Sequence, residues 1–477
     1  MLEMSVESKN WVPHEYQKNA IKFLLEHACA GLFLDPGLGK TSISLGACKV
    51  LRSQNMFKGA LVVAPLRVCY SVWPKEVDKW SDFSHLKVVV LHGSQKESAL
   101  NEKADLYVIN PEGLEWLFSN GRSKTLFSSV DTLIVDESTR FKHCATRRFK
   151  TLKPFLHKFA RRWILTGTPA PNGLMDLFGQ IYILDMGRSF TPYISKFRQE
   201  FFFQTGFGGY TWVPKTDTEN RIHELLNPLV LRLEARDYLK LPKLVTTPQT
   251  DIVVVLPPAA RKIYDEMETE MMAVLEGMEI VTAMSAAAAS MKCRQIANGG
   301  IYRQLDVDPA TRSERWQPIH DAKTDALEEL FEGLNGQQLL VAYEFNHDLD
   351  RIRKRFPKAT YAVDYSAKKF PEIEAAWNAG EISMLVAQPQ SVGHGLNLQG
   401  GNAQHICWYS QIWDLETYDQ FILRILRQGN KSSHVFVHHI IAENTVDRAV
   451  IRSLRRKAGV QNRLLDSLKE YRKERLN

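Results

Sequence analysis

Residues 31–46 read GLFLDPGLGKTSISLG, and this stretch decides the fold. A short apolar run leads into a turn that contains Gly37 and Gly39, and small residues that suit the start of a helix follow. Glycines allow successive backbone N–H groups to point inward around a phosphate, while Lys40 adds a cation and Thr41 a hydroxyl for magnesium. The pattern GxxxxGK[ST] is matched only in part, because its first glycine is absent. We therefore expect a phosphate-binding loop between a buried strand and a helix, with an ordinary glycine-rich turn as the alternative.

The apolar run is the first of a series of short β-type runs that are separated by helical stretches. In the first part of the chain, to about residue 180, the runs are AGLFLD, GALVVAPL, LKVVVLHG, ADLYVIN, VDTLIVDE and RRWILTGTP. A later series comprises QQLLVAYE, KATYAVDY, ISMLVAQP, AQHICWYS and HVFVHHII. Near-continuous apolar strands that alternate with helices indicate parallel sheets covered on both faces. The sequence thus predicts an α/β fold with two lobes.

We place the first lobe at residues 1–250, with a helical insertion at about 173–250, and the second at residues 251–477, with a helical insertion at about 258–320. The two inserted segments carry too much apolar material to be solvated linkers.

Composition sets limits on the class of protein. A chain of 477 residues with 44% hydrophobic and 24% charged residues suits two soluble globular domains. The excess of 61 Lys and Arg over 54 Asp and Glu permits a polyanionic partner without requiring one. Six scattered cysteines without a CxxC pair indicate neither a zinc site nor a disulfide framework. There is no signal-like start and no run of about 18 apolar residues, so we expect an intracellular protein without a membrane partner, cytoplasmic in a bacterium or in the host cell if viral.

The strand-like segment LIVDEST supplies the second half of a phosphate site. Asp136 would hold the magnesium, usually through water, and Glu137 would position and deprotonate the attacking water. Solvated carboxylates at a strand end are the alternative. Their place about a hundred residues after the Lys40 turn, in the same α/β lobe, favours the catalytic interpretation.

The next strand-like segment ends in Thr166, Gly167 and Thr168, where a loop could sense the nucleotide and pass its state onward. An ordinary strand-to-helix turn capped by Asn172 is the alternative.

In the second lobe, ETYDQFILRILRQGN places Gln420, Arg424 and Arg427 at helical spacings of four and three, so we expect one helix face to carry all three and Gly429 to end the helix. Arginine is planar and always charged, which suits stabilisation of a γ-phosphate in the transition state. Arginines on a helix face are more often solvated, but the apolar neighbours here indicate a packed surface.

Taken in order, these motifs resemble those of the superfamily 2 helicases and translocases, specifically the Swi/Snf-like branch. The similar segments are HEYQKNAIKFLL for the glutamine motif, DPGLGKT for motif I, VVAPLRV for Ia, YVINPEGL for Ib, DEST for II, LTGTPAPNGLMDLF for III, LLVAYEFNHDLD for IV, GHGLNLQ for V and QFILRILRQGN for VI. The match runs from about residue 12 to about 450. It implies two RecA-like domains with ATP between them, hydrolysed with Mg²⁺.

The resemblance also assigns roles to individual residues. Nucleotide contacts fall to Gln17, Pro36, Gly37, Leu38, Gly39, Lys40, Thr41, Ser42 and Gly395. The metal would be held by Thr41 and Asp136, and catalysis would use Lys40, Asp136, Glu137, Arg424 and Arg427. Coupling would involve Thr166, Gly167, Thr168 and Gln420, and nucleic acid would contact Pro65, Leu66, Arg67, Asn110, Pro111, Gly393 and Asn397.

Three departures from the family pattern affect coupling and DNA grip rather than the fold. Motif II reads DEST where the family usually has Asp-Glu-Ala/Gly-His, so Ser138 and Thr139 must replace whatever the histidine does. Glu234 stands in a stretch that is usually basic, and Gln388 and Gln390 stand where motif V usually has Ser/Thr-x-Arg.

The expected function is an ATP-dependent motor that translocates on duplex DNA and remodels or anneals it, with protein partners for targeting. Contacts to the phosphate backbone make binding sequence-independent and sensitive to salt. The close alternative is a strand-separating helicase on DNA or RNA. A nucleotide-gated nucleic-acid-binding protein with little turnover is the alternative from another class.

Overall fold

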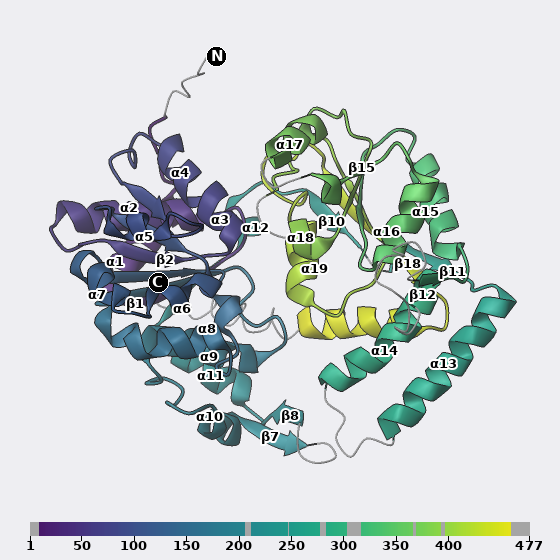
Figure 1. The fold of residues 1–477 in the computed structure, drawn as a ribbon, viewed down its shortest axis with the longest axis horizontal. Helices are drawn as coiled ribbons and strands as arrows, with labels where there is room; N and C mark the ends of the chain where they lie inside the picture. Colours follow the sequence, from purple (N-terminus) through teal and green to yellow (C-terminus); the bar gives the residue numbers. More distant parts are fainter. Residues whose placement is uncertain are drawn as a thin grey trace. The chain divides into compact units, whose positions relative to one another are not determined.

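The computed structural model of the chain describes residues 9–205, 211–246, 248–276, 283–302, 316–365, 369–392 and 396–458. These residues form two compact units, drawn from purple to blue and from teal through green to yellow in Figure 1. The first unit includes residues 9–203 and 214–239, and the second includes residues 240–458. Each unit contains its own parallel sheet, so the expected α/β fold with two sheets in tandem is confirmed.

In the first unit, the described strands lie in the order β3-β4-β2-β5-β6-β1-β9. Their bounds are β1 (Cys29–Leu34), β2 (Ala60–Val63), β3 (Val88–Val90), β4 (Leu106–Ile109), β5 (Thr132–Asp136), β6 (Arg161–Thr166) and β9 (Val230–Leu233). Every residue of β2, β4, β5 and β9 is buried. This explains the near-continuous apolar runs from which most of these strands were predicted, because both faces of the sheet are covered.

The helices of the first unit occupy the stretches between these strands. Their bounds are α1 (Glu15–Glu26), α2 (Lys40–Ser53), α3 (Leu66–Ser71), α4 (Trp73–Lys79), α5 (Lys96–Asn101), α6 (Leu114–Leu117), α7 (Arg122–Ser129), α8 (Arg147–Leu152), α9 (Leu177–Asp185), α10 (Ile194–Phe201), α11 (Thr218–Leu226) and α12 (Ala235–Tyr238). Short 3-10 helices include η2 (Ser138–Phe141), which follows β5, and η4 (Leu174–Asp176), which precedes α9.

In the second unit, the strands lie in the order β10-β18-β17-β14-β16-β15, and β11 also pairs with β18. Their bounds are β10 (Lys243–Val245), β11 (Asp251–Val254), β14 (Leu339–Ala342), β15 (Thr360–Tyr361), β16 (Met384–Ala387), β17 (His405–Trp408) and β18 (His434–Ala442). The helices are α13 (Pro258–Glu276), α14 (Ala283–Asn298), α15 (Ala322–Gly333), α16 (Asn346–Arg355), α17 (Phe370–Asn378), α18 (Pro389–Val392) and α19 (Leu415–Ile422). Residues 446–458 are also helical.

The second sheet has a hydrophobic core on each face. Leu340, Leu385 and Ile406 are neighbours in register on β14, β16 and β17, and they belong to the core that α17 and α19 cover. The residues that follow them on each strand belong to the core that α15 and α16 cover. Such alternation is what a sheet buried on both faces produces.

The segments expected to be helical insertions also contain strands. Within residues 173–250, β9 joins the first sheet beside β1 and β10 joins the second sheet beside β18. A small sheet of β7 (Phe202–Thr205) and β8 (Thr211–Pro214) lies in the same span. In the later span, α13 and α14 pack side by side (Figure 1), and β12 (Gly300–Tyr302) pairs with β13 (Trp316–Pro318). The strands were missed because they are only three or four residues long, which is too short to show a period.

Candidate active site

The candidate residues of the first unit lie at one edge of its sheet. In parallel strands the carboxyl ends meet at the same edge, and ligands of open α/β sheets bind there. Across this edge, β4, β2, β5, β6 and β1 are consecutive neighbours. The chain segments that leave them begin at Asn110, Ala64, Glu137, Gly167 and Asp35, so the expected DNA-contacting, magnesium-binding, coupling and phosphate-binding segments follow one another along the edge.

The glycine turn after β1 contains two residues in the left-handed region of backbone conformation. Gly37 and Gly39 have φ angles of 92° and 80°, in the left-handed region that glycine adopts without strain. α2 begins at Lys40, which places its N-terminal N–H groups and its positive dipole end at the turn. Lys40 Nζ donates to the Leu34 carbonyl at 2.7 Å. The turn, the cation and the helix start are therefore together, as the sequence predicted.

Two predicted members of this loop differ in their surroundings. Thr41 lies half-buried in the first turn of α2. The hydroxyl of Ser42 donates to Glu76 Oε1 on α4. Ser42 is thus held by α4 through its side chain, which leaves its backbone N–H as the group suited to a phosphate.

Gln17 on α1 is buried against the same loop. Its Nε2 donates to the Leu38 carbonyl at 3.2 Å, and its Oε1 accepts from the backbone N–H of His14 at 3.0 Å. A Cβ added to Gly39 would lie 2.6 Å from Gln17 Nε2. The left-handed φ angle favours glycine at this position, and the Gln17 amide lies where a side chain would begin.

A buried arginine, which the sequence reading missed, braces the start of the loop. Arg232 on β9 lies 2.7 Å from Asp35 Oδ1, and its Nη1 donates to the Phe33 carbonyl at 3.0 Å. Asp35 Oδ2 in turn accepts from the backbone N–H of Ala235 at 3.0 Å. The sequence indicates this role only by one arginine inside the apolar run LVLRL. The pairing of β9 with β1 is what brings this arginine to Asp35.

Asp136 is a buried carboxylate at the end of β5. Trp73 Nε1 donates to its Oδ2 and the backbone N–H of Glu137 donates to its Oδ1, each at 3.1 Å. Burial, together with the neighbouring charge of Glu137, raises the pKa of Asp136 from 3.8 to about 6, against the opposing effect of Lys40. Trp73 was not predicted as a site residue, because an indole in an apolar segment is usually a core residue. Here the ring is fully buried in the core, and its N–H also donates to Asp136.

Glu137 adopts a left-handed backbone conformation with φ 51° and ψ 58°. Non-glycine residues rarely adopt this region, and such strain gathers at functional sites. The turn carries the chain away from β5 directly after Asp136 and into η2. Asp136 and Glu137 therefore lie together at the edge as the sequence predicted.

The loop after β6 packs directly against the glycine turn. A Cβ on Gly167 would lie 3.0 Å from Pro36 Cδ and 3.3 Å from the Leu34 carbonyl. Thr166 Oγ1 accepts from the backbone N–H of Thr168 at 3.1 Å, which holds the loop in a tight turn. Contact between these two loops is what the predicted coupling role needs.

The expected nucleic-acid contacts of the first unit follow β2 and β4. Pro65 precedes α3, where Leu66 is exposed and Arg67 is half-buried. Asn110 and Pro111 follow β4 and are both buried, and Asn110 Nδ2 donates to Glu112 Oε2 at 2.8 Å. Leu66 and Arg67 are thus the members of this set with side chains open to a large ligand.

In the second unit, the expectation that one helix carries Gln420, Arg424 and Arg427 is wrong, because the helix is shorter than predicted. α19 ends at Ile422, before Arg424 and Arg427. The reason is local: Arg424 Nε donates to the Gln420 carbonyl at 2.9 Å, whereas the backbone N–H of Arg424 turns to the Phe421 carbonyl at 3.1 Å. The arginine side chain takes the place of a helical N–H, so the chain tightens and leaves the helix.

The two arginines contact residues within motif V. Arg424 Nη1 donates to the Leu396 carbonyl at 3.2 Å, and Arg427 Nη1 donates to Asn397 Oδ1 at 3.1 Å. Asn397, expected at the nucleic acid, is therefore bonded to an expected catalytic arginine. Gly393 and Gly395 lie outside the described residues.

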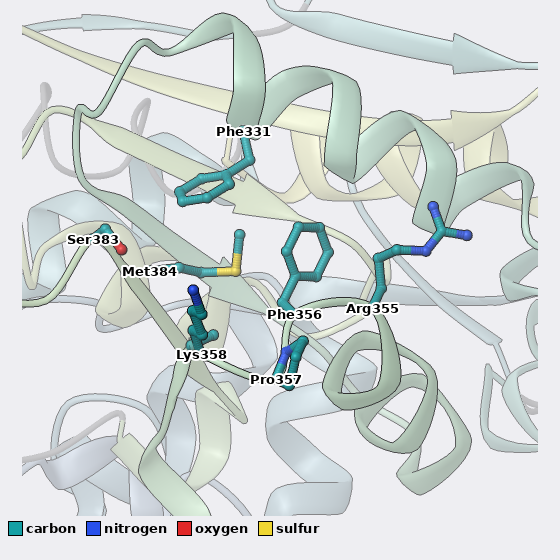
Figure 2. A pocket seen from close by; sticks show the side chains of 8 residues that line it. Phe331, Arg355, Phe356, Pro357, Lys358, Ser383 and Met384 are labelled. Carbon is teal, nitrogen blue, oxygen red and sulfur yellow. The ribbon is translucent and has the colours of Figure 1, made fainter.

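An apolar cavity of about 310 Å³ lies elsewhere in the second unit (Figure 2). The side chains of Phe331, Phe356 and Met384 converge in it, and Arg355 and Lys358 also line it. It adjoins the amino ends of β15 and β16, the edge opposite to the one from which α18 departs. It is thus separate from the motifs described above.

Comparison with known proteins identifies the family. The model of the SNF2-related domain matches residues 16–300, which is more than half of the chain. The chain belongs to the SNF2-related family.

Relatives of this family member differ widely in length. It is 36% identical over 478 residues to the putative protein p41 of Acyrthosiphon pisum secondary endosymbiont phage 1, covering 97% of this chain and 99% of that protein. It is 23% identical to the DNA repair and recombination protein RDH54 of Saccharomyces cerevisiae (strain AWRI1631) over 93% of this chain, but spans only 52% of RDH54. The Sulfolobus solfataricus SWI2/SNF2 ATPase core in complex with dsDNA aligns over 96% of both chains with a TM-score of 0.43 and 19% identity. Among the described residues, no helix has the length and apolarity needed to span a membrane.

Proposed function

We propose that this SNF2-related chain is a motor that hydrolyses ATP with Mg²⁺ and uses the energy to translocate on duplex DNA. One observation supports the proposal above the others. A left-handed glycine turn with its lysine follows β1, and a buried aspartate with a strained glutamate beside it ends β5; β6 alone separates these two parallel strands, so both groups lie at the same sheet edge. A structural turn would need neither the buried charge nor the strained backbone.

The residues at this edge fit magnesium. The Thr41 hydroxyl and the Asp136 carboxylate are hard oxygen donors, the type that Mg²⁺ prefers. Burial raises the pKa of Asp136, and a divalent cation is a partner that would favour its charged form. When bound, Mg²⁺ would neutralise charge on the phosphate oxygens.

The chain's own residues would then perform four tasks. The N–H groups of the glycine turn and Lys40 would bind the phosphates, because they place positive charge at a helix start. Gln17, bonded to the same turn, would contact the adenine. Glu137 would orient a water and accept its proton, and Arg424 and Arg427 would stabilise negative charge on the transferred phosphate.

DNA is the polyanion that a relative's name points to, since RDH54 is a DNA repair and recombination protein. Arg67 and Asn397 would contact the phosphate backbone, which carries no sequence information, so we expect binding without sequence preference. Each neutralised phosphate releases counterions, so the affinity should fall steeply as salt rises.

The test is ATP hydrolysis by the purified chain alone and with single-stranded DNA, duplex DNA or RNA. Lys40→Ala is the inactivating variant. Lys49→Ala, on the same helix but paired with Asp82 at the surface, is its matched control. Strong stimulation by duplex DNA that only Lys40→Ala abolishes supports the motor.

Preference for a single strand would replace translocation on duplex DNA by strand separation. Turnover near background with every nucleic acid would overturn the proposal and favour a nucleotide-gated binding protein.

A further inference from the structure

A buried hydrogen-bonded pair links the turn after β5 to the loop after β6. Ser138, the first residue of η2, donates from Oγ to Gln180 Oε1 at 2.7 Å. Gln180 on α9 donates from Nε2 to the Pro169 carbonyl at 2.7 Å and to the Asp176 carbonyl at 2.8 Å. Ser138 and Gln180 are both completely buried. A single amide side chain thus bonds both segments that flank the candidate active site.

The elements that carry this pair are in backbone contact. A Cβ added to Gly179 would lie 2.1 Å from the Phe141 carbonyl oxygen, so no side chain fits between α9 and η2. Next to this contact, Asp176 Oδ2 accepts from the backbone N–H of Asn172 at 2.9 Å and lies 3.9 Å from Lys142 Nζ. Closely packed elements transmit displacement, because there is no gap to absorb it. A shift of the loop after β6 must therefore act on η2.

The residue directly before this pair is Glu137, whose left-handed backbone needs support from its surroundings. The Ser138 hydroxyl bond is a side-chain contact that fixes the next residue of the chain. Ser138 is also one of the positions at which DEST departs from the motif that it resembles. The hydroxyl that this departure introduces is the group that donates to Gln180.

We propose that Ser138 and Gln180 are positioning residues that hold Glu137 in the orientation for hydrolysis and tie it to the loop of residues 166–172. The nucleotide-dependent state of that loop and the orientation of Glu137 then change together. This inference rests on the proposed ATP hydrolysis and extends it by naming the connection between the two motifs.

The experiment compares Ser138→Ala, Gln180→Met and the double variant in the full chain. Gln180→Met keeps the length and volume of the side chain while removing its polar atoms. Gln338→Met is the matched control, because Gln338 Nε2 also donates to two backbone carbonyls, at 2.9 and 2.8 Å, but in the second unit.

We expect each single variant to lower kcat with duplex DNA by about tenfold to a hundredfold while KM for ATP stays within about twofold. The kcat of the double variant should equal that of the single variants, because all three variants break the same connection. Gln338→Met should leave kcat unchanged. Unchanged kcat in the single variants, even with a lower unfolding temperature, would show a merely structural role and overturn the proposal, as would multiplied losses in the double variant.

A second readout does not depend on turnover. Hydrogen exchange of residues 137–141 and of the loop at residues 166–173 is measured with and without a slowly hydrolysed ATP analogue and Mg²⁺. We expect the analogue to protect both this loop and residues 137–141 in the wild type, and to protect the loop alone in the variants. If the wild type hydrolyses no ATP, the proposed function fails, and this comparison still decides on the pair: joint protection that persists in the variants would overturn it.

Discussion

The buried carboxylate of Asp136 predicts a conflict between stability and activity. Without magnesium and nucleotide, the folded chain holds the Asp136 proton up to a pH of about 6, whereas an ordinary aspartate releases it near 3.8. Between these values the folded state binds more protons than the unfolded state, so this group makes folding less favourable as the pH rises through the window. Asp136→Asn removes the charge and should stabilise the apo chain while abolishing ATP hydrolysis.

The magnitude follows from the same contacts. At about 1.4 kcal/mol per pH unit, the window corresponds to about 3 kcal/mol of destabilisation at pH 8, of which about half remains at pH 5. Asparagine offers one oxygen where the carboxylate accepts from both Trp73 Nε1 and the Glu137 N–H, so losing one hydrogen bond costs about 1 kcal/mol. The net gain is about 2 kcal/mol at pH 8, or roughly 4–8 °C in Tm for a unit of this size, and less than about 1 kcal/mol at pH 5.

The assay is thermal unfolding of wild type and variant at pH 5 and pH 8 in the presence of a chelator. Asp131→Asn, at the other end of β5, is the matched control and should give no gain at either pH. Activity is measured separately with Mg²⁺, ATP and duplex DNA. If the variant is no more stable than the wild type at pH 8, or gains the same stability at both pH values, then the buried Asp136 charge does not destabilise the fold.

Two further substitutions test the loop after β1. Arg232→Met should lower the free energy of unfolding by about 3 kcal/mol and weaken ATP binding, because it leaves Asp35 without its buried partner. Chemical denaturation measures the stability, and nucleotide titration measures the binding. Unchanged values of both would contradict the bracing role. Gln17→Ala should raise KM for ATP about tenfold with little change in kcat, which corresponds to the loss of one or two hydrogen bonds at the loop. A tenfold fall in kcat with constant KM would instead assign Gln17 to the chemical step.

Strand positions could be predicted well because burial on both faces leaves a continuous apolar run in the sequence. The helix of motif VI was predicted too long because spacing alone does not reveal side-chain competition for backbone carbonyls. Arg424 Nε occupies the Gln420 carbonyl, and that bond is possible only once the side chain has folded back along its own turn. The two arginines nevertheless lie together beside Leu396 and Asn397.

The sequence by itself determined the α/β class, the two sheets and the local chemistry of the loops after β1 and β5, since these depend on apolar runs and on residues close together in the chain. Tertiary structure alone decided which distant side chains support them. Trp73 reaches Asp136 from 63 residues away, Arg232 reaches Asp35 from β9, and Gln180 joins Ser138 to the next loop. The physical reason is that a tryptophan, an arginine or a glutamine carries no local signal of its partner, which only strand order and helix packing bring within hydrogen-bonding distance.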